Sequence, residues 1–566
     1  MTQPSVAEVT RELTSAGALF ELEERDVGGR RVRYWKNFPR TLAEVVRAAL
    51  HHSDKTYLVY EDERLNYAQS FERVAALSAH LIASGVRPGD RVAIAMRNLP
   101  EWVMAFWAST LTGAVVVPLN AWWKGAELTY GLSDSGSRVL LCDLERAELL
   151  ASHLPETNVQ QVIVARAPLT TPLPEGMLRF EEVWPRYHGA ALPELGISPE
   201  DDATIFYTSG TTGRPKGALG THINICSNIG SSMYARYRTA MRNGEDFTQL
   251  IVQALSRQPA FLLSVPLFHV TGCHSGLTMN TFMGTKIVMM HKWQPERALE
   301  LIEREKVTLF GGVPSMVWQV LESPDFARRD LSSVLTVSYG GAPAAPELVR
   351  RIKQSFPQSS ASNGYGLTET SALACSNAGI DYERKPDSVG VQVALCDIKV
   401  VDVDGKELPA GEVGELCIRG ANVVRGYFGK PEATALTFRD GWLHTGDVAR
   451  IDEEGFIYIL DRAKDMLIRG GENVYCVEVE DVLYSHPAVM DAAVIGIAHR
   501  VLGEEVGAVV QLAPGFTVSA EQLREYAAER LANFKVPVRI ELRVEPLPRN
   551  PNGKIMKREL KRELGW

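Results

Sequence analysis

The chain of 566 residues is 45% hydrophobic and 23% charged, proportions that are typical of a globular protein and exclude a disordered or collagen-like chain. At roughly 150 residues per domain, this length predicts three or four folding units, enough to enclose a cleft. The 60 basic and 69 acidic residues give a net charge of −9. Without a basic stripe, this balance argues against nucleic acid as the main partner.

Targeting signals and redox signals are mostly absent. The N-terminus has no basic region followed by an apolar stretch, so no signal peptide is predicted. No run approaches the roughly 18 apolar residues of a transmembrane segment. The seven cysteines are scattered and never spaced as C-x-x-C, which favours reduced thiols over disulfides or zinc. We therefore expect a cytoplasmic protein, and the sequence leaves a homodimer open.

Helical and strand patterns alternate through the first half of the chain. Thr41, followed three residues later by Glu44, has the pattern of a capping box that opens a helix. Asn66 begins a second helical pattern, and Gly85 is placed to end it. A short apolar run, a helical stretch and a β-branched run follow over residues 92–96, 100–113 and 114–120. This alternation predicts an α/β architecture with largely parallel sheets.

The pattern changes after about residue 388. Short strands joined by Asp-Gly and Ala-Gly turns predict an antiparallel β unit there. The last hundred residues return to mixed α and β, with Ser519 placed to cap a helix.

A glycine-rich loop over residues 203–217, ATIFYTSGTTGRPKG, is the most informative stretch. A strand-like run leads into glycines, Ser and Thr hydroxyls and Lys216, a composition that can hold phosphate oxygens. A ligand-free turn of similar composition is the alternative. The Walker pattern fails, because Pro215 stands where its second glycine belongs and Gly217 where a hydroxyl should follow the lysine. A conventional nucleotide-hydrolysing motor is therefore disfavoured.

The loop resembles the signature of the adenylate-forming enzymes, which include acyl-CoA synthetases, luciferases and peptide-synthetase adenylation domains. Further motifs of that family follow in the family's order: PLFHVTG (266–272), YGGAP (339–343), NGYGLTET (363–370), GWLHTGD (441–447), DRAKDMLIRGGENV (461–474) and PRNPNGKI (548–555). The chain is most similar in pattern to an AMP-forming acyl-CoA synthetase. That resemblance implies ATP-dependent activation of a carboxylic acid to an acyl-adenylate, with pyrophosphate release, and then transfer to CoA.

The resemblance also implies an ATP site and its Mg²⁺. Glu369 would bind the Mg²⁺, Thr368 would contact the α-phosphate, and Lys554 would be the catalytic lysine that bridges the carboxylate and the α-phosphate. Asp447 would accept the ribose hydroxyls with help from Arg462, and Tyr365 would stack on the adenine. The full predicted ATP site is Thr208, Ser209, Gly210, Thr211, Thr212, Gly213, Lys216, Gly341, Ala342, Pro343, Asn363, Gly364, Tyr365, Gly366, Thr368, Asp447, Ile459, Arg462 and Lys554.

The same resemblance implies two domains. A large N-terminal domain of α/β subdomains plus the β unit would span residues 1–463, and a small mobile α+β domain would span residues 464–566. Lys464 would be the hinge that lets one site serve two half-reactions. Gly470 and Gly471 would line the CoA tunnel, although an ordinary loop also explains two glycines.

The predicted acyl pocket surrounds His269, which resembles the residue that gates the acyl tunnel in acyl-CoA synthetases and is counted among the catalytic candidates. A lone histidine in an apolar stretch is more often a packed core residue, so both readings stay open. The motif 266–272 contains no acidic residue, which disfavours amino acids and favours a fatty or other apolar acid. The pocket residues implied by the resemblance are His269, Val270, Thr271, Cys273, Gly312, Val313, Tyr339 and Gly340.

Other functions remain open at this stage. The acyl group could pass to a carrier protein instead of CoA, because Tyr475 and Cys476 replace a Ser-Pro pair that relatives often have near the CoA tunnel. A nucleotide- or acyl-binding homologue without catalysis is a different class, and a luciferase-like oxidation is a weaker option. Intact Lys554, Glu369, Asp447 and Arg462 argue against lost catalysis.

Overall fold

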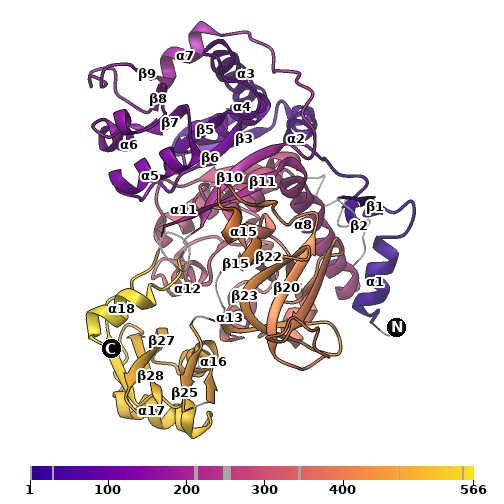
Figure 1. Cartoon of the computed structure of the whole chain (residues 1–566). Helices are drawn as coiled ribbons and strands as arrows, with labels where there is room; N and C mark the ends of the chain where they lie inside the picture. Colours follow the sequence, from indigo (N-terminus) through magenta and orange to yellow (C-terminus); the bar gives the residue numbers. More distant parts are fainter. Residues whose placement is uncertain are drawn as a thin grey trace.

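The computed structural model describes residues 3–27, 31–208, 214–245, 257–341, 346–463, 465–470, 472–550 and 553–566. Figure 1 shows the chain starting at the right with its N-terminal helix and then forming an upper helix-and-sheet part, a central part, an antiparallel β unit and a small C-terminal part at lower left. The mixed α/β class predicted from the alternating patterns is confirmed. Among the described residues, no helix is long and apolar enough to cross a membrane.

The upper sheet has the strand order β21-β11-β10-β6-β5-β7-β8-β9. The strands from β10 through β9 in that order run parallel, as the strand–helix–strand pattern predicted, and β11 and β21 add an antiparallel edge. The strands are β5 (Arg91–Ala95), β6 (Val115–Pro118), β7 (Val139–Asp143), β8 (Gln161–Ala165), β9 (Met177–Arg179), β10 (Asp202–Thr208), β11 (Lys216–Thr221) and β21 (Gly426–Tyr427).

The central sheet has the order β18-β17-β16-β15-β14-β12-β13-β3-β4, parallel in its middle and antiparallel at both edges. Parallel strands end at the same edge, so the loops after β12, β14, β15 and β16 gather there. The strands are β3 (Thr56–Tyr60), β4 (Glu63–Asn66), β12 (Ala260–Leu263), β13 (Lys286–Met289), β14 (Leu309–Gly312), β15 (Thr336–Gly340), β16 (Ser360–Tyr365), β17 (Cys375–Ala378) and β18 (Val391–Gln392).

The β unit predicted after residue 388 is an antiparallel sheet of order β19-β20-β23-β22, with β24 paired to β23. The C-terminal sheet has the order β26-β25-β28-β27, with β29 on β28. The strands are β19 (Cys396–Val401), β20 (Gly414–Gly420), β22 (Phe438–Arg439), β23 (Trp442–Ile451), β24 (Ile457–Arg462), β25 (Leu467–Arg469), β26 (Glu472–Val474), β27 (Val489–His499), β28 (Gly503–Leu512) and β29 (Arg539–Arg543).

The chain passes from the antiparallel β unit to the C-terminal sheet between β24 and β25. The predicted boundary at residues 463 and 464 lies in this interval. Lys464 itself lies outside the described residues, so its role as a hinge stays a prediction.

The remaining elements are the two strands of a separate antiparallel sheet, β1 and β2, together with the helices and turns. They are β1 (Leu22–Asp26), β2 (Arg31–Trp35), α1 (Val6–Leu13), α2 (Leu42–Ala49), α3 (Tyr67–Ala83), α4 (Pro100–Leu111), α5 (Gly125–Ser135), α6 (Leu144–Leu150), α7 (Phe180–Arg186), α8 (His222–Asn243), α10 (Met279–Phe282), α11 (Pro295–Glu305), α12 (Pro314–Glu322), α13 (Pro346–Ser355), α14 (Gly379–Arg384), α15 (Pro431–Thr437), α16 (Cys476–Tyr484), α17 (Ala520–Ala528), α18 (Lys557–Leu564), a π-helix η3 (Thr271–Thr278), and the 3₁₀ turns η1 (Leu50–His52), η2 (Leu154–Glu156), η4 (Phe326–Arg328), η5 (Thr368–Thr370) and η6 (Asn533–Lys535).

Three helix starts were predicted from cap residues, and Ser519 forms a full capping box with Gln522 at the start of α17. Asn66 forms a full capping box with Gln69 at the start of α3. At α2 the box is only half formed. The Thr41 hydroxyl accepts the Glu44 N–H, but the Glu44 carboxylate accepts the N–H of Arg40 instead of that of Thr41. The prediction of a complete box at Thr41 is therefore wrong, although the helix begins where the cap residue indicated.

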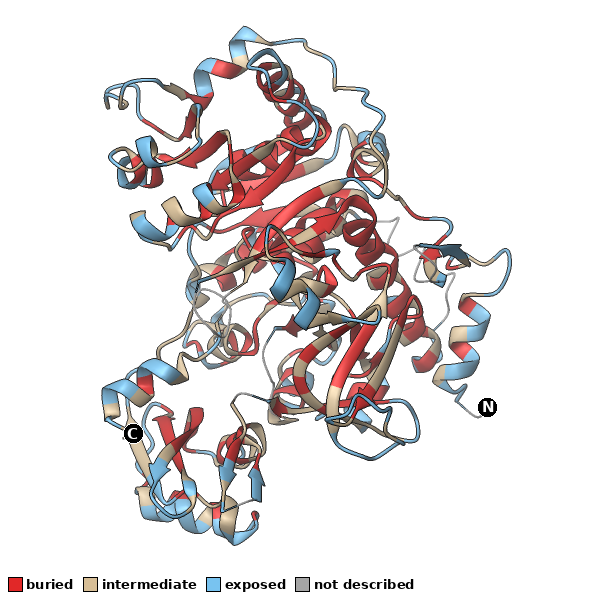
Figure 2. Ribbon diagram, viewed as in Figure 1, coloured by how far each residue is buried: buried red, intermediate tan, exposed pale blue. Residues whose placement is uncertain are grey.

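The core runs through the sheets and the helices packed on them, as the buried residues in Figure 2 show. Helix α4 begins with proline at its first turn, where the missing N–H costs nothing, and every residue in it is buried. A helix that is buried on all sides and largely apolar is typical of a position inside the core.

Close strand packing next to the carboxyl edge of the central sheet gives a first testable prediction. A Cβ added at Gly311 would lie 1.5 Å from the backbone oxygen of Ser338 on the neighbouring strand. Gly311→Ala must therefore push β14 and β15 apart, and we expect it to reduce the free energy of unfolding by about 3 kcal/mol or more. Thermal unfolding monitored by circular dichroism measures the shift.

The matched control for this variant is Gly196→Ala, because a Cβ at Gly196 meets nothing within 4 Å. We expect Gly196→Ala to unfold within a degree or two of the parent, since exposed substitutions change stability by less than about 0.5 kcal/mol. Equal unfolding temperatures for the two variants would contradict the close packing of β14 on β15.

Candidate active site

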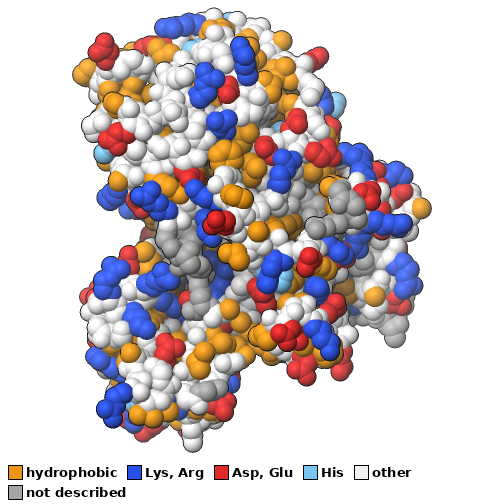
Figure 3. All heavy atoms as spheres, viewed as in Figure 1, with side chains coloured by type: hydrophobic (Ala, Val, Ile, Leu, Met, Phe, Trp, Pro, Cys, Tyr) orange, Lys and Arg blue, Asp and Glu red, His pale blue; other side chains and the backbone are white. Residues whose placement is uncertain are grey.

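A cavity of about 2450 Å³ opens between the large part of the molecule and the small C-terminal part. Its walls come from the carboxyl edge of the central sheet, from the β unit and from α16 and the residues around α18. Figure 3 shows it as the hollow at left, with Lys and Arg side chains along its borders. A cavity at the carboxyl ends of parallel strands is the usual position of a ligand site in α/β proteins.

Every predicted ATP-site residue that the structure describes lines this one cavity. These residues are Thr208, Lys216, Gly341, Asn363, Gly364, Tyr365, Gly366, Thr368, Asp447, Ile459, Arg462 and Lys554. The rest of the predicted set, Ser209, Gly210, Thr211, Thr212, Gly213, Ala342 and Pro343, lies outside the described residues. The structure therefore brings together motifs separated by more than 300 residues, while the individual roles stay predictions.

Asp447 is a carboxylate in the cavity wall that is held at both of its oxygens. It stands opposite Arg462 in the β23–β24 pair, and its Oδ1 is 2.6 Å from the Arg462 Nε. The Tyr365 hydroxyl donates to its other oxygen at 2.5 Å. Asp447 is only 2% exposed. An oriented carboxylate of this kind can accept two hydroxyl groups of a diol.

Burial raises the pKa of Tyr365 well above its usual value, and the negative charge of Asp447 raises it further. The phenol is therefore a proton donor at any working pH. Sequence reasoning placed Tyr365 against the adenine, and the structure adds this hydrogen bond to the predicted ribose site.

Glu369 reaches the cavity through an unusual turn. It lies in η5, and the next residues, Ser371 and Ala372, have φ of 51° and 106°, a region that non-glycine residues rarely adopt. A Cβ at Gly366 would lie 1.4 Å from the oxygen of Ala372, so glycine is required where the chain folds back on itself. Strain of this kind is concentrated at functional sites.

The Tyr427 hydroxyl donates to the Glu369 Oε1 at 2.7 Å, and the Lys216 Nζ lies 5.1 Å from the centre of the Tyr427 ring. Burial, and then the charge of Glu369, raise the pKa of Tyr427. Tyr427 thus links the predicted metal carboxylate to the phosphate-loop lysine. Sequence reasoning missed this residue, because its position depends on the pairing of β21 with β11, which cannot be predicted from a local pattern.

The residues around Glu369 fit the predicted Mg²⁺. Tyr427 donates a hydrogen bond to one oxygen of the Glu369 carboxylate. Glu369 lines the cavity, and its second oxygen can serve as the metal ligand. Mg²⁺ in nucleotide sites is held by one or two carboxylates and completes its shell with phosphates and water. A single hard oxygen ligand beside a phosphate-binding lysine is consistent with that chemistry.

Lys554 enters the cavity on a turn from the small C-terminal part. The turn is closed by the Asn550 side chain, which accepts the Lys554 N–H at 3.0 Å. A Cβ at the preceding Gly553 would lie 2.5 Å from the Val313 side chain, so the turn presses against the predicted acyl pocket. Lys554 is also close enough to His269 to affect its protonation.

His269 is held neutral by its surroundings. Burial, and then the positive charge of Lys554, lower its pKa to about 3. Its Nε2 is buried and has no hydrogen-bond partner among the described residues. A buried polar atom without a partner costs free energy, so a group placed there by a substrate would be stabilised.

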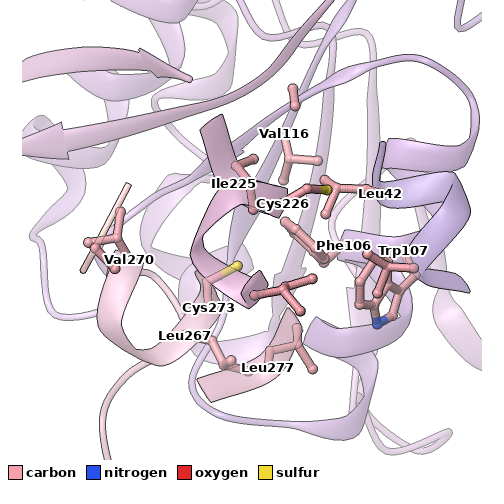
Figure 4. Packing of buried hydrophobic residues seen from close by; sticks show 14 of the residues in the cluster. Leu42, Phe106, Trp107, Val116, Ile225, Cys226, Leu267, Val270, Cys273 and Leu277 are labelled. Atoms are coloured by element: carbon pink, nitrogen blue, oxygen red, sulfur yellow. The ribbon is translucent and has the colours of Figure 1, made fainter. Parts of the chain in front are cut away.

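Seven of the eight predicted acyl-pocket residues line the cavity, while their role as an acyl pocket stays a prediction. His269, Val270, Thr271, Gly312, Val313, Tyr339 and Gly340 line the cavity, whereas Cys273 does not. The π-helix η3 points Cys273 toward the core, where it is fully buried beside Leu267 and Leu277 (Figure 4). The placement of Cys273 in the pocket wall is therefore wrong, because its side chain is fully buried in the core and its η3 neighbours Gly272 and Ser275 line the cavity instead.

The predicted CoA-tunnel residues are not brought to the cavity in this arrangement. Gly470 is exposed on the turn between β25 and β26 and is not part of the cavity wall, and Gly471 lies outside the described residues. Their role was predicted for a second position of the small domain, so it stays a prediction.

Removing the Tyr427 hydroxyl tests the link to Glu369. Tyr427→Phe deletes a hydrogen bond to a charged group, which is typically worth about 1.5–3 kcal/mol. We expect kcat/KM for ATP to fall at least about tenfold, measured by steady-state pyrophosphate release. Tyr526→Phe, on α17 and outside the cavity, should leave kcat/KM unchanged. Indistinguishable effects of the two variants would show that Tyr427 does not support Glu369.

Comparison with known proteins agrees with this geometry. The family model described as AMP-binding enzyme matches residues 45–428, and the model of the AMP-binding enzyme C-terminal domain matches residues 478–554. The chain belongs to the AMP-binding enzyme family. Among curated relatives, a feruloyl-CoA synthase of Amycolatopsis sp. is 35% identical, covering 92% of this chain and 98% of that protein. A long-chain-fatty-acid–CoA ligase of Bacillus subtilis is 32% identical, covering 93% of this chain and 94% of that protein.

Solved structures show the same architecture. The o-succinylbenzoate CoA synthetase of Bacillus subtilis, in complex with its acyl-adenylate intermediate, matches with a TM-score of 0.76 and 31% identity, covering 91% of this chain and 97% of that one. Membership in the family confirms the predicted reaction class, an AMP-forming acid–thiol ligase, and its cofactors ATP, Mg²⁺ and CoA. The cytoplasmic location, the homodimer and the absence of a nucleic-acid partner stay predictions.

Proposed function

We propose that this member of the AMP-binding enzyme family activates an acid with a mainly apolar body and transfers it to CoA. The observation that carries the proposal is the convergence of Lys554, Glu369 and His269 on one cavity, next to an acyl pocket walled by uncharged residues. The Asp447–Arg462 pair lines the same cavity.

In the first half-reaction, a carboxylate oxygen of the acid attacks the α-phosphorus of ATP and pyrophosphate leaves. The Lys554 ammonium, on its Asn550-closed turn, would lie between the carboxylate and the α-phosphate and stabilise the charge that accumulates there. Asp447 would hold the ribose and fix the in-line geometry. Bound at Glu369, Mg²⁺ would neutralise phosphate charge.

In the second half-reaction, the CoA thiol releases its proton to solvent, its sulfur attacks the acyl carbon, and AMP leaves with the bonding electrons. Neutral His269 adds no charge next to the thiol or the anhydride. We propose that the small domain turns about residue 464 between the two steps and withdraws Lys554, so that one cavity serves both reactions.

The nature of the acid follows from the pocket wall. Val270, Gly312 and Val313 offer apolar or open surface, and Tyr339 is nearly fully buried with its hydroxyl bonded to Tyr382 at 2.8 Å. That pairing leaves the Tyr339 ring, and not a polar group, as pocket surface. A fatty or aromatic acid suits such a wall. The named relatives, a feruloyl-CoA synthase and a long-chain-fatty-acid–CoA ligase, span both types.

A panel assay tests the proposal. Pyrophosphate release is measured with ATP, Mg²⁺ and CoA against fatty, aryl and branched acids, and thioester products are identified by mass spectrometry. We expect at least one acid to give both pyrophosphate and its CoA thioester. Pyrophosphate without a CoA thioester would point to a carrier-protein acceptor, and silence across the panel would contradict the proposed acid class.

A further inference from the structure

Three side chains of different chemistry converge on the β unit at the rim of the cavity. Glu415 and Cys417 lie on β20, two residues apart and hence on one face of the strand. His444 lies on β23 directly opposite Cys417. One possible ligand atom from each of the three falls within 4.8 Å of the other two. None of these residues has a part in the proposed reaction.

The spacing of these atoms is close to that of ligands around a tetrahedral metal ion. The Cys417 Sγ is 3.5 Å from the His444 Nδ1. With zinc–sulfur and zinc–nitrogen bonds of about 2.3 and 2.05 Å, tetrahedral geometry requires a separation of about 3.5 Å. The Glu415 Oε2 is 2.8 Å from the same nitrogen and would have to retreat by about 0.5 Å. Glu415 is half-buried on the cavity rim, which leaves room for that movement.

A cation already occupies the point where these groups converge. The Arg439 Nη2 is 2.6 Å from the His444 Nδ1 and 3.5 Å from the Glu415 carboxylate. A guanidinium can only donate and a carboxylate can only accept, so Nδ1 cannot satisfy both neighbours at once. The Arg439 side chain is 53% exposed and can turn out to solvent. Its departure would leave a thiol, an imidazole and a carboxylate facing one position.

We propose that Glu415, Cys417 and His444 form a binding site for Zn²⁺, with water as the fourth ligand and Arg439 displaced outward. Sulfur and imidazole ligands select zinc over the magnesium and calcium that prefer oxygen. On binding, the Cys417 thiol releases its proton to solvent and coordinates as the thiolate. The spacing of the cysteines along the chain could not predict this site, because Cys417 and His444 come together only through strand pairing.

The site is coupled to the proposed ribose site through Glu415. The Glu415 Oε1 accepts the Gly446 N–H at 3.1 Å, and Gly446 immediately precedes Asp447. Drawing Glu415 onto a metal ion weakens that bond and loosens the backbone that positions Asp447. Zinc bound here would therefore raise KM for ATP without occupying the ATP site.

Metal titration of the full chain tests the proposal. The protein is stripped with a chelator and titrated with Zn²⁺ alone, in competition with a chromophoric chelator and without nucleotide. We expect one tight equivalent, weakened at least about 100-fold by Cys417→Ser and by His444→Gln. Cys142→Ala is the matched control, because Cys142 is also buried, lies on β7 and belongs to no group of possible metal ligands among the described residues. It should bind zinc like the parent.

A second measurement identifies the ligand atoms. Titration with Co²⁺ alone should produce a thiolate-to-cobalt charge-transfer band and strong tetrahedral visible absorption, both lost in Cys417→Ser. Near-equal Zn²⁺ affinity in the parent and in Cys417→Ser would overturn the proposal, as would bound Co²⁺ without a thiolate band. Thermal unfolding confirms that each variant is folded before titration.

Discussion

Lys554→Ala is expected to lower acid-dependent ATP–pyrophosphate exchange by about 10²–10³-fold, the usual loss when one charge-stabilising group is removed from a reaction centre. The turn that carries Lys554 presses on Val313 at the acyl pocket, and its charge reaches His269. Turnover of pre-formed acyl-adenylate with CoA should change only a few-fold, because the lysine is assigned to the first half-reaction alone.

The control for this prediction is Lys561→Ala. Lys561 lies on α18, seven residues further along the same part of the chain, and its side chain is 39% exposed and 4.0 Å from Glu504. It should leave both half-reactions unchanged. Equal losses in exchange and in adenylate turnover for Lys554→Ala would contradict its assigned role.

Asp447→Asn is expected to lower kcat/KM for ATP by about 10²–10³-fold while leaving KM for the acid nearly unchanged. The amide keeps the shape of the carboxylate but loses its charge and one of its two acceptors, so it cannot receive two ribose hydroxyls and also hold Arg462 and Tyr365. Steady-state kinetics with each substrate varied in turn measures the two constants.

The matched control is Asp452→Asn on the same hairpin. Asp452 follows β23 and pairs with Lys385 at 2.5 Å, but it is not part of the cavity wall. It should leave kcat/KM for ATP within about twofold, since its ion pair serves the hairpin and not the site. A similar loss in both variants would mean that Asp447 acts through the stability of the hairpin and not through ATP.

The sequence allowed prediction of features that depend on local order. The alternation of strands and helices, the antiparallel unit after residue 388 and the cap at Asn66 each rest on neighbouring residues, and each is present. The motifs also marked Asp447 and Arg462, which β23 and β24 place opposite each other. The family resemblance singled out these two residues, and they meet because a hairpin brings its own strands together.

Features that depend on distant pairing could not be predicted in the same way. The Tyr427–Glu369 bond spans 58 residues and arises only because β21 joins the edge of the upper sheet. Cys273 was misplaced because the resemblance marks the segment but not which of its side chains face the cavity, and on η3 the Cys273 side chain is fully buried. The cluster of Glu415, Cys417 and His444 depends on the register of β20 against β23, which the spacing of cysteines along the chain does not contain.

The central claim is that the acid's carboxylate attacks the α-phosphorus of ATP and that the acyl group then passes to CoA. The most direct test uses an acid that the panel identifies, labelled with ¹⁸O in its carboxylate, in a complete reaction with ATP, Mg²⁺ and CoA. Mass spectrometry of the nucleotide product then follows the label. The account predicts AMP carrying one ¹⁸O atom and unlabelled pyrophosphate. Unlabelled AMP would contradict the acyl-adenylate route. So would the formation of ADP together with ¹⁸O-labelled inorganic phosphate.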